Sequence, residues 1–121
     1  EVLTPDFAGA GAAIDRGAAV GPEIFGHNVE TVERLHGAMR PQADYERSLA
    51  LLARVKRRFP RVLTKSGLMV GVGERPEEVI DLLHDLREAG CDLVTIGQYL
   101  APSARHHPVV EYVHPDQFER Y

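Results

Sequence analysis

The sequence predicts an α/β domain built on parallel strands, and three observations indicate it. Amphipathic helices are expected over residues 43–59 and 76–89. Each is followed at once by an apolar run, at 61–70 and 92–96, of the kind that forms a buried parallel strand. The alternation of helices with strands favours parallel pairing through right-handed crossovers.

The composition is that of one ordinary globular domain. The chain has 121 residues, of which 44% are apolar and 26% charged, enough for one domain and too few for two. A formal net charge of −4 argues against nucleic acid or an anionic membrane as the main partner. No apolar run approaches the roughly 20 residues of a membrane span, and no signal peptide is recognised. The single cysteine, Cys91, excludes an internal disulfide and a multi-cysteine metal site built from this chain alone.

The first third of the chain predicts weaker elements. Residues 2–4 are strand-like, and because a domain seldom begins inside a strand, we expect the chain to be a fragment. The alanine-rich segment 10–19 predicts a short helix, in which each glycine costs about 1 kcal/mol relative to alanine. Residues 23–28 predict a short strand. The segment 29–35 is ambiguous between a helical turn and a loop, and we expect 36–41 to be irregular.

The helix over 43–59 has the clearest pattern. Its apolar residues recur at helical spacing; they are Tyr45, Leu49, Leu52, Val55 and Phe59. Acidic residues lie near its start and basic residues near its end, as the helix dipole prefers, and Pro60 stops it. The second helix begins at Pro76 and ends before Gly90, a residue type that favours the position after a helix.

The remainder is expected to be mostly loop. Residues 97–102 form the loop at the carboxyl end of the last strand, and 103–107 are polar. The segment 109–113 predicts a short strand or an extended segment. Pro115 then opens a final helical turn or two that ends at Tyr121.

Three of these strands are expected to end at one edge of the sheet, where α/β folds bind ligands. The central stretch, Thr64–Glu74, ends in a glycine-broken turn that leaves backbone accessible. The three strand ends supply His27, Asn28 and Glu30, then Gly71, Gly73 and Glu74, then Gly97, Gln98 and Tyr99. Such a rim suits a nucleoside, with Asn28 and Glu30 bonding a ribose or amino acid moiety and Met69 or Val70 against the base. Strand ends also carry polar residues and glycines simply to turn the chain, and spacing alone favours neither interpretation.

Other notable residues have structural explanations of similar or greater weight. The glycines of the central stretch lack the spacing of a dinucleotide fingerprint or a P-loop. Lys65 either meets an anionic group or faces solvent at a strand edge. We expect His106 and His107 to lie in a surface loop, because no metal-ligand spacing surrounds them. Cys91 is expected to be a small buried residue rather than a nucleophile.

Four ordered blocks are far more specific. They are Phe25-Gly26-His27-Asn28-Val29-Glu30-Thr31-Val32, Arg40-Pro41-x-Ala43-x-Tyr45-x-x-Ser48-Leu49, Thr64-Lys65-Ser66-Gly67-Leu68-Met69-Val70-Gly71-x-Gly73-Glu74 and Gly97-Gln98-Tyr99-Leu100-x-Pro102. Together they strongly resemble lipoyl synthase. The opening residues 1–7 and the closing residues 108–115 also resemble that family, so the resemblance covers nearly the whole chain.

The resemblance implies a radical S-adenosylmethionine enzyme with a partial (β/α)6, TIM-like barrel. Residues 1–121 would be one partial core domain, the second half of that barrel, truncated at both ends. The family inserts two sulfurs into the octanoyl chain of lipoyl-carrier proteins, namely acyltransferase subunits of 2-oxoacid dehydrogenases and the glycine cleavage carrier protein. Its cofactors are S-adenosylmethionine, cleaved to a 5′-deoxyadenosyl radical at one [4Fe–4S] cluster, and a second cluster that donates sulfur. The resemblance also implies the bacterial cytoplasm, with no nucleic acid or membrane partner.

The same resemblance implies which residues contact S-adenosylmethionine. Asn28 and Glu30 lie on the strand that meets its ribose and methionine part. Gly67-x-Met69-x-Gly71-x-x-Glu74 resembles the superfamily motif G-x-I-x-G-x-x-E, whose strand packs beside the adenine. Gln98, Tyr99 and Leu100 resemble the last barrel strand, where backbone groups meet the adenine. Lys65 and Arg40 are further candidates.

The departures from the family limit what this chain does alone. The C-x-x-x-C-x-x-C motif of the catalytic cluster, the second cysteine motif and the carboxyl-terminal Arg-Ser-Ser-Tyr segment are absent. We therefore expect no catalytic residue, no metal ligand and no activity from this chain by itself. Two alternatives remain open: a different radical S-adenosylmethionine enzyme, or a non-catalytic half-barrel that binds a nucleotide or pairs with another chain.

Overall fold

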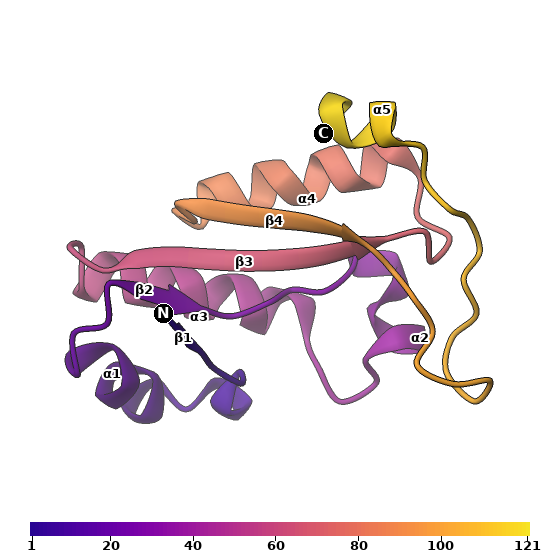
Figure 1. The fold of residues 1–121 in the computed structure, drawn as a ribbon. Coiled ribbons are helices and arrows are strands. Elements are labelled where there is room, and N and C mark those ends of the chain that lie inside the picture. The colour runs from indigo at the N-terminus through magenta and orange to yellow at the C-terminus, as the bar shows by residue number, and fades with distance from the viewer.

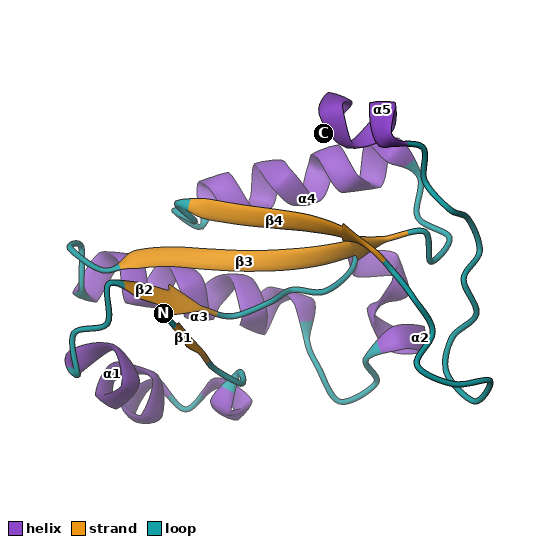
Figure 2. Cartoon of the chain, in the orientation of Figure 1, coloured by secondary structure: helices purple, strands orange, loops and turns teal.

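The computed structural model describes all 121 residues and confirms the predicted α/β class (Figures 1 and 2). Four parallel strands form one sheet in the order β1-β2-β3-β4. The strands are β1 (Val2–Leu3), β2 (Ile24–Gly26), β3 (Leu63–Val70) and β4 (Leu93–Gln98). The long strand β3 pairs with β4 from Lys65 to Val70 and with β2 over a shorter stretch.

The chain also contains five α-helices and two short 3₁₀ turns, of which α5 follows the last strand and the others lie between strands. The helices are α1 (Gly11–Ala19), α2 (His36–Met39), α3 (Tyr45–Arg58), α4 (Pro76–Glu88) and α5 (Pro115–Arg120), and the 3₁₀ turns are Phe7–Gly9 and Glu33–Leu35. Figure 2 shows α3 and α4 running alongside the strands. Helix α3 leads into β3 and α4 leads into β4, which is the expected helix–strand alternation.

The two faces of the sheet differ in burial because side chains alternate along a strand. On one face of β3, Leu68 and Val70 are buried in the main hydrophobic cluster. That cluster also contains Phe25 of β2, Leu51, Leu52 and Val55 of α3, and Val79, Leu82 and Leu86 of α4. On the other face of β3, Lys65 and Met69 are only half-buried. The sheet therefore packs its helices on one face and leaves the other face more open.

Helix α4 begins at Pro76 as predicted, and α3 begins at Tyr45, two residues after its predicted start. The Asp44 carboxylate accepts a hydrogen bond from the Arg47 backbone N–H at 2.7 Å and caps α3. Pro76 occupies the first turn of α4, and the Glu78 carboxylate accepts from the Arg75 backbone N–H at 2.8 Å. Gly90 has a φ of +78°, which is the left-handed conformation expected just after a helix.

The basic run at the end of α3 is partly engaged in ion pairs. Arg54 contacts the Asp15 carboxylate at 2.7 Å, which ties α1 to α3. Lys56 contacts Asp92 at 2.8 Å, which ties the start of β4 to the same helix. Arg57, next to Lys56, is exposed to solvent.

The expectation that residues 36–41 are irregular is wrong, because α2 occupies His36–Met39. The His36 side chain is buried and packs edge-on against the Tyr45 ring, with 5.4 Å between ring centroids. His36 and Tyr45 belong to different helices, so no pattern within residues 36–41 could predict this contact. The ambiguous segment 29–35 contains both an isolated bridge at Glu30 and a 3₁₀ turn at its end.

Three strand boundaries also need correction. Strand β2 covers only Ile24–Gly26 of the predicted residues 23–28. Strand β3 begins at Leu63 rather than at residue 61. Strand β4 continues two residues past Ile96, because Gly97 and Gln98 still pair with Met69 and Val70 of β3. Residues 109–113 were predicted to be a short strand or an extended segment. They form no strand of the sheet, so the extended segment is the prediction that remains.

An ion pair between Arg34 and Glu78 joins the segment after β2 to the first turn of α4. Arg34 Nε donates to Glu78 Oε1 at 2.7 Å, and Arg34 Nη2 donates to Glu78 Oε2 and to the Gly73 carbonyl, both at 2.9 Å. The Arg34 guanidinium, followed by the Arg75 backbone N–H, lowers the pKa of Glu78 from 4.5 to about 2. A lowered folded-state pKa means that the carboxylate stabilises the fold above pH 4.5 and that this contribution disappears as the pH falls toward 2.

We therefore expect Glu78→Gln to lower the free energy of unfolding at pH 7. The difference from wild type should shrink as the pH falls from 4.5 to 2. Urea unfolding followed by far-ultraviolet circular dichroism measures it. Glu77→Gln, on the same turn but exposed, is the matched control and should change stability little. An equal effect from both variants, or a pH-independent loss in Glu78→Gln, would contradict this role.

Candidate functional site

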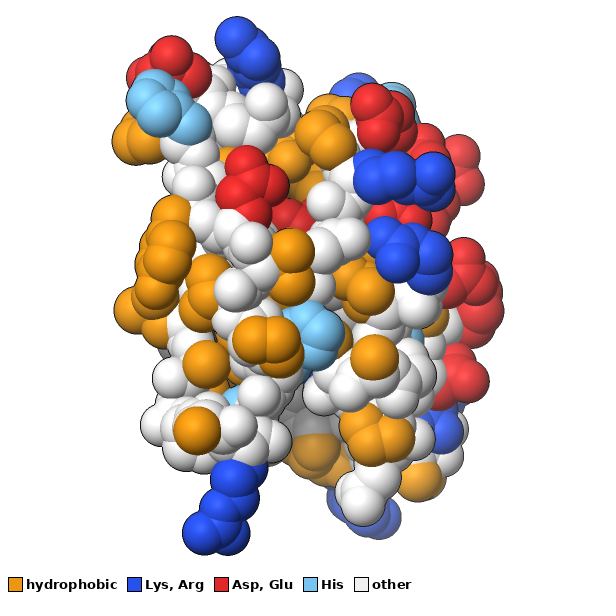
Figure 3. All heavy atoms as spheres, turned by 90° about the vertical axis from the view of Figure 1, so that its right-hand side faces the viewer, with side chains coloured by type: hydrophobic (Ala, Val, Ile, Leu, Met, Phe, Trp, Pro, Cys, Tyr) orange, Lys and Arg blue, Asp and Glu red, His pale blue; other side chains and the backbone are white.

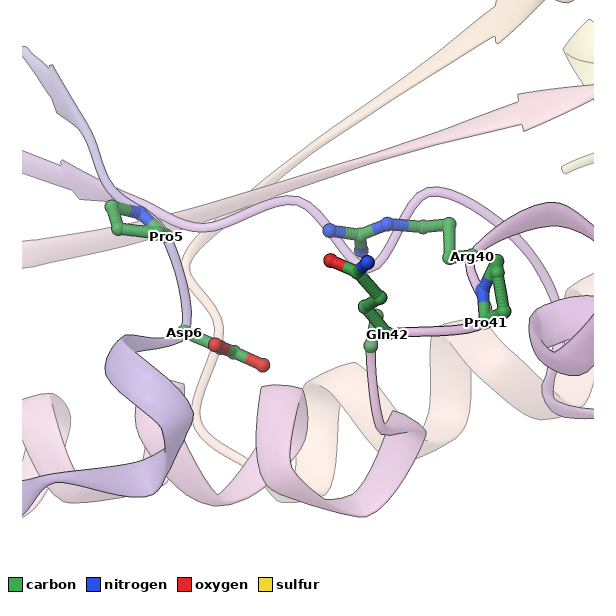
Figure 4. Close-up of a pocket in the computed structure, with 6 residues that line it drawn as sticks. Pro5, Asp6, Arg40, Pro41 and Gln42 are labelled. Carbon is green, nitrogen blue, oxygen red and sulfur yellow. The ribbon is translucent and has the colours of Figure 1, made fainter.

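Two cavities open beside the carboxyl ends of the strands, at the edge that lies to the right in Figure 1. The larger has a volume of about 570 Å³ and is lined by Glu30, Ala38, Met39, Arg40, Met69, Tyr99, Pro102, Arg105, His106 and His107. The second, about 430 Å³, is lined by Pro5, Asp6, Arg40, Pro41, Gln42 and Ala43 (Figure 4). Figure 3 views this edge directly and shows apolar side chains over much of its centre and left, with charged side chains gathered at the right.

Glu30 reaches the larger cavity from a strained backbone. Its φ is +70°, a conformation that is unfavourable for a residue with a Cβ. Its N–H donates to the Gly67 carbonyl at 2.9 Å, and its carbonyl accepts from the Met69 N–H at 2.8 Å. These two bonds to β3 hold Glu30 in place. Its carboxylate forms no ion pair, so it is available to a ligand in the cavity.

Asn28 and Thr95 lie over Gly67 on the open face of the sheet. A Cβ on Gly67 would come within 2.9 Å of both Asn28 Oδ1 and Thr95 Oγ1, so only glycine lets the two side chains approach. Thr95 is directly opposite Gly67 in the pairing of β3 with β4. Thr95 was not among the sequence-based candidates. Side chains alternate between the two faces of a strand, so Thr95 lies on the same face of β4 as the candidate Gly97, two residues away. That spacing could have predicted Thr95 as a further candidate.

The turn after β3 is held by Glu74. Gly71 has a φ of +94°, which favours glycine. The two carboxylate oxygens of Glu74 accept from the N–H groups of Gly71 at 2.7 Å and Val72 at 2.9 Å. The Gly71 carbonyl accepts from the Val110 N–H at 2.8 Å. Glu74 therefore supports the turn, and its predicted part in ligand binding would act through the shape of that turn.

Residues 107–113, which we call the strap, cross the ends of β3 and β4. Gln98 fastens the strap: its Nε2 donates to the Glu111 carbonyl at 3.0 Å, and its Oε1 accepts from the Val113 N–H at 2.9 Å. The buried Tyr99 hydroxyl donates to the His107 carbonyl at 2.9 Å. His107 Nε2 lies 2.9 Å from the Val72 carbonyl and is therefore its donor. His107 is the residue of the strap that lines the larger cavity.

Of the nine predicted binding residues, three line the larger cavity, namely Glu30, Met69 and Tyr99, and six do not, namely Asn28, Lys65, Gly71, Glu74, Gln98 and Leu100. Lys65 Nζ contacts the Glu1 carboxylate at 2.9 Å on the open face, so its charge is compensated. Leu100 is 65% exposed and does not line either cavity. The side chain of Gln98 bonds the strap, as described above.

The placement of His27 at the site rim is wrong. Its side chain is 2% exposed, with Nδ1 3.0 Å from the Thr4 carbonyl and Nε2 3.0 Å from Ser48 Oγ. Burial lowers its pKa, which favours the neutral ring. His27 is a packed polar residue that joins the end of β1 to α3. His106 is exposed, as expected for a surface loop.

Several cavity residues have no local sequence signal. Ala38 and Met39 line the larger cavity because α2 forms where irregular chain was expected. Arg105 and His106 line it because the loop after β4 folds back toward α2. Arg40, which lines both cavities, was a candidate only through the family resemblance.

The side chains at this edge suit a nucleoside that carries an amino acid moiety. The larger cavity combines a free carboxylate (Glu30), a guanidinium (Arg40), a thioether (Met69) and a phenol (Tyr99). Glu30 offers an acceptor for hydroxyl or ammonium groups, and Met69 offers an apolar surface for a base. Gly97 pairs with Met69, and a Cβ added to Gly97 would meet no atom within 4 Å, which leaves room above the sheet.

The chain does not supply the ligands of an iron–sulfur cluster. Such a cluster is held by several thiolates, and Cys91 is the single cysteine. Its Sγ lies 3.2 Å from the Leu93 carbonyl, and burial raises its pKa, so it stays a protonated thiol. No three His, Cys, Asp or Glu side chains lie close enough together to hold a metal ion. None of the helices has the length and apolar character needed to cross a membrane.

Comparison with known proteins confirms the resemblance stated above. The chain is 55% identical to the lipoyl synthase of Caldicellulosiruptor saccharolyticus, 56% to that of Caldanaerobacter subterraneus and 57% to that of Chlorobaculum parvum. Each alignment covers 100% of this chain and 41–43% of the relative. No family model matches the chain. The chain is therefore homologous, over its whole length, to about two fifths of lipoyl synthase.

Replacement of Gly71 by alanine should loosen the strap. The added Cβ would be strained by the positive φ and would collide with the Glu111 carbonyl and the Gln98 amide. We expect a loss of about 1 kcal/mol or more in stability. We also expect faster hydrogen exchange at the amides of Val110 and Val113, measured by nuclear magnetic resonance.

Gly97→Ala is the matched control, because a Cβ there meets no atom within 4 Å. It should leave exchange in the strap unchanged. Equal loss of protection in both variants would show that the strap does not depend on the Gly71 turn.

Proposed function

We propose that this chain is the carboxyl-side part of a lipoyl synthase and that it contributes half of the S-adenosylmethionine site. The observation that carries the proposal is the cavity of about 570 Å³ at the strand ends, where Glu30, Met69 and Tyr99 meet. The identity of 55–57% to lipoyl synthases over the full chain supports it.

We further propose that residues 1–121 are a single partial domain, truncated at both ends, that forms the second half of a (β/α)6, TIM-like barrel. In such barrels the helices cover the outside of a parallel sheet and the ligand lies at the carboxyl ends of the strands. The helix-covered face and open face of this sheet support that arrangement. So does the position of β1 and β4 as edges, each paired on one side.

The proposed contacts follow from the positions of the predicted residues. Asn28 and Glu30 would accept hydrogen bonds from the ribose hydroxyls, and Met69 would pack against the adenine. Tyr99 and Leu100 would offer backbone groups to the adenine edge. Gly71, Glu74 and Gln98 would act indirectly, because their contacts hold the turn and the strap beside the ligand. Lys65 would contact the ligand only if its ion pair with Glu1 were broken.

The whole protein would be a sulfurtransferase of the bacterial cytoplasm. Its substrate would be an octanoyl chain on a lipoyl-carrier protein, and its cofactors S-adenosylmethionine and two [4Fe–4S] clusters. S-adenosylmethionine, when bound in the complete enzyme, supplies the 5′-deoxyadenosyl radical. This chain's residues would bind and orient that molecule. Because it lacks the cluster cysteines, we propose that the chain alone is inactive.

The gene sequence around this segment tests the proposal. We expect an in-frame C-x-x-x-C-x-x-C motif upstream of the codon for Glu1 and an Arg-Ser-Ser-Tyr segment downstream of Tyr121. Sequencing of the flanking DNA measures both. A start codon directly before Glu1, with no cysteine motif in frame, would contradict the proposal and favour a non-catalytic half-barrel.

A further inference from the structure

His36 is a buried histidine whose ring nitrogens have no hydrogen-bond partner. Its side chain is 5% exposed, and neither Nδ1 nor Nε2 forms a hydrogen bond. The other buried histidine, His27, has a partner on each ring nitrogen. A neutral imidazole carries one N–H donor and an imidazolium carries two, so protonation of His36 would add a charge and a second unsatisfied donor to a buried site. The surroundings of His36 therefore suit the neutral ring and disfavour the charged one.

The groups closest to the His36 ring give an imidazolium too little compensation. Burial, followed by the nearby cation of Arg40, lowers the pKa of His36 below its ordinary value of 6.5. The backbone carbonyls of Val29 and Thr31 and the carboxylate of Asp44 act in the opposite direction, each with a smaller effect. His36 forms no ion pair with any carboxylate.

The other titratable side chains on the elements around His36 are engaged elsewhere. Tyr45 of α3, whose ring packs edge-on against His36, donates its hydroxyl hydrogen to Asp85 of α4 at 2.6 Å. Between β2 and α2, Glu30 lines the larger cavity and Glu33 lines a separate cavity beside α4. None of these carboxylates is paired with the ring.

His36 begins α2, which lies beside the larger cavity at the right of Figure 1. Ala38 and Met39 of this helix line the cavity, and so does Arg40, the residue that ends it. The helix has four residues and no side-chain cap at its start, and helices this short depend on tertiary contacts. The burial of His36 at one end and the hydrogen bonds from Arg40 to two backbone carbonyls at the other are contacts that hold α2 in place.

We infer that protonation of His36 releases α2 from the larger cavity, so that access to this cavity depends on pH. A buried imidazolium without a carboxylate partner is stabilised by exposure of the ring to water. Because the pKa of His36 is lowered when α2 is docked, the released form binds more protons, and its population rises as the pH falls below 6.5. One proton gives a rise of up to about tenfold per pH unit in the ratio of released to docked α2. This switch concerns the shape of the cavity and does not depend on which ligand occupies it.

The two methionines of the chain report on the cavity, because Met39 on α2 and Met69 on β3 both line it. The chain is labelled with [¹³C-methyl]methionine, which gives two signals that Met39→Leu assigns. Relaxation of both signals by a soluble gadolinium chelate is measured from about pH 8 to about pH 5, the range in which histidine titrates. We expect both methyl groups to become more accessible to the chelate as the pH falls below 6.5.

Hydrogen exchange measures the size of the effect. The Arg40 N–H donates to the His36 carbonyl at 2.7 Å, so its protection reports whether α2 is formed. We expect this protection, corrected for the intrinsic exchange rate, to fall by up to about tenfold per pH unit below 6.5. Protection that stays constant across this range would overturn the inference.

His36→Phe keeps an aromatic ring against Tyr45 and removes the titrating group. We expect it to abolish the pH dependence of both methyl accessibility and Arg40 protection. His84→Phe is the matched control, because His84 is exposed on α4, and it should keep the pH dependence of wild type. An equal pH dependence in wild type and in His36→Phe would overturn the inference and assign the effect to another group.

A measurement on wild type alone keeps the test decisive if His36→Phe does not fold. The ring ¹⁵N shifts of His36 follow its protonation, and we expect their midpoint to coincide with the midpoint of the change in methyl accessibility. Methyl groups that become accessible at a pH where the His36 ring is still neutral would overturn the inference.

Discussion

The turn from Gly71 to Glu74 joins β3 to the strap and to α4, and the carboxylate of Glu74 holds it by accepting two backbone N–H groups. The Gly71 carbonyl accepts from the strap, and Gln98 bonds the strap from β4. Tyr99, next in sequence, donates its N–H to the Val70 carbonyl at 2.8 Å. The end of β3 and the strap, which contribute Met69 and His107 to the larger cavity, are therefore joined through one hydrogen-bonded turn, whose geometry favours glycine.

Two charged groups at the carboxyl edge lack the ion pairs that many other charged groups of the chain form. On the helical side, Asp15, Asp92 and Glu78 each have a basic partner at 2.7–2.8 Å. At the carboxyl edge, Glu30 and Arg40 line one cavity without ion-pair partners, although Glu30 stands on strained backbone and Arg40 is partly buried. Structural stability alone would favour neutralising or exposing both groups. Their position at a strand-end cavity is consistent with a ligand of complementary charge, because strained groups gather at functional sites.

Local sequence patterns predicted the long elements and missed what depends on contacts between elements. Helix α3 and the strand–turn–helix around β3 followed from periodicity, proline and glycine. Helix α2 did not, because the burial of His36 against Tyr45 stabilises it from outside. The strain at Glu30 likewise comes from its two bonds to β3. The sequence placed His27 at the rim of the site. Local patterns could not show its burial, because its hydrogen-bond partners, Thr4 and Ser48, lie far away in sequence.

We propose that a nucleoside lies against Met69 on β3, between His107 and α2. Isotope-filtered nuclear Overhauser spectra of the ¹³C-labelled chain with S-adenosylhomocysteine measure this contact directly. We expect cross-peaks from the adenine protons to the Met69 methyl group and from ribose protons to the Glu30 side chain. Cross-peaks confined to Pro5 and Gln42 in the second cavity, with none at Met69, would contradict the claim.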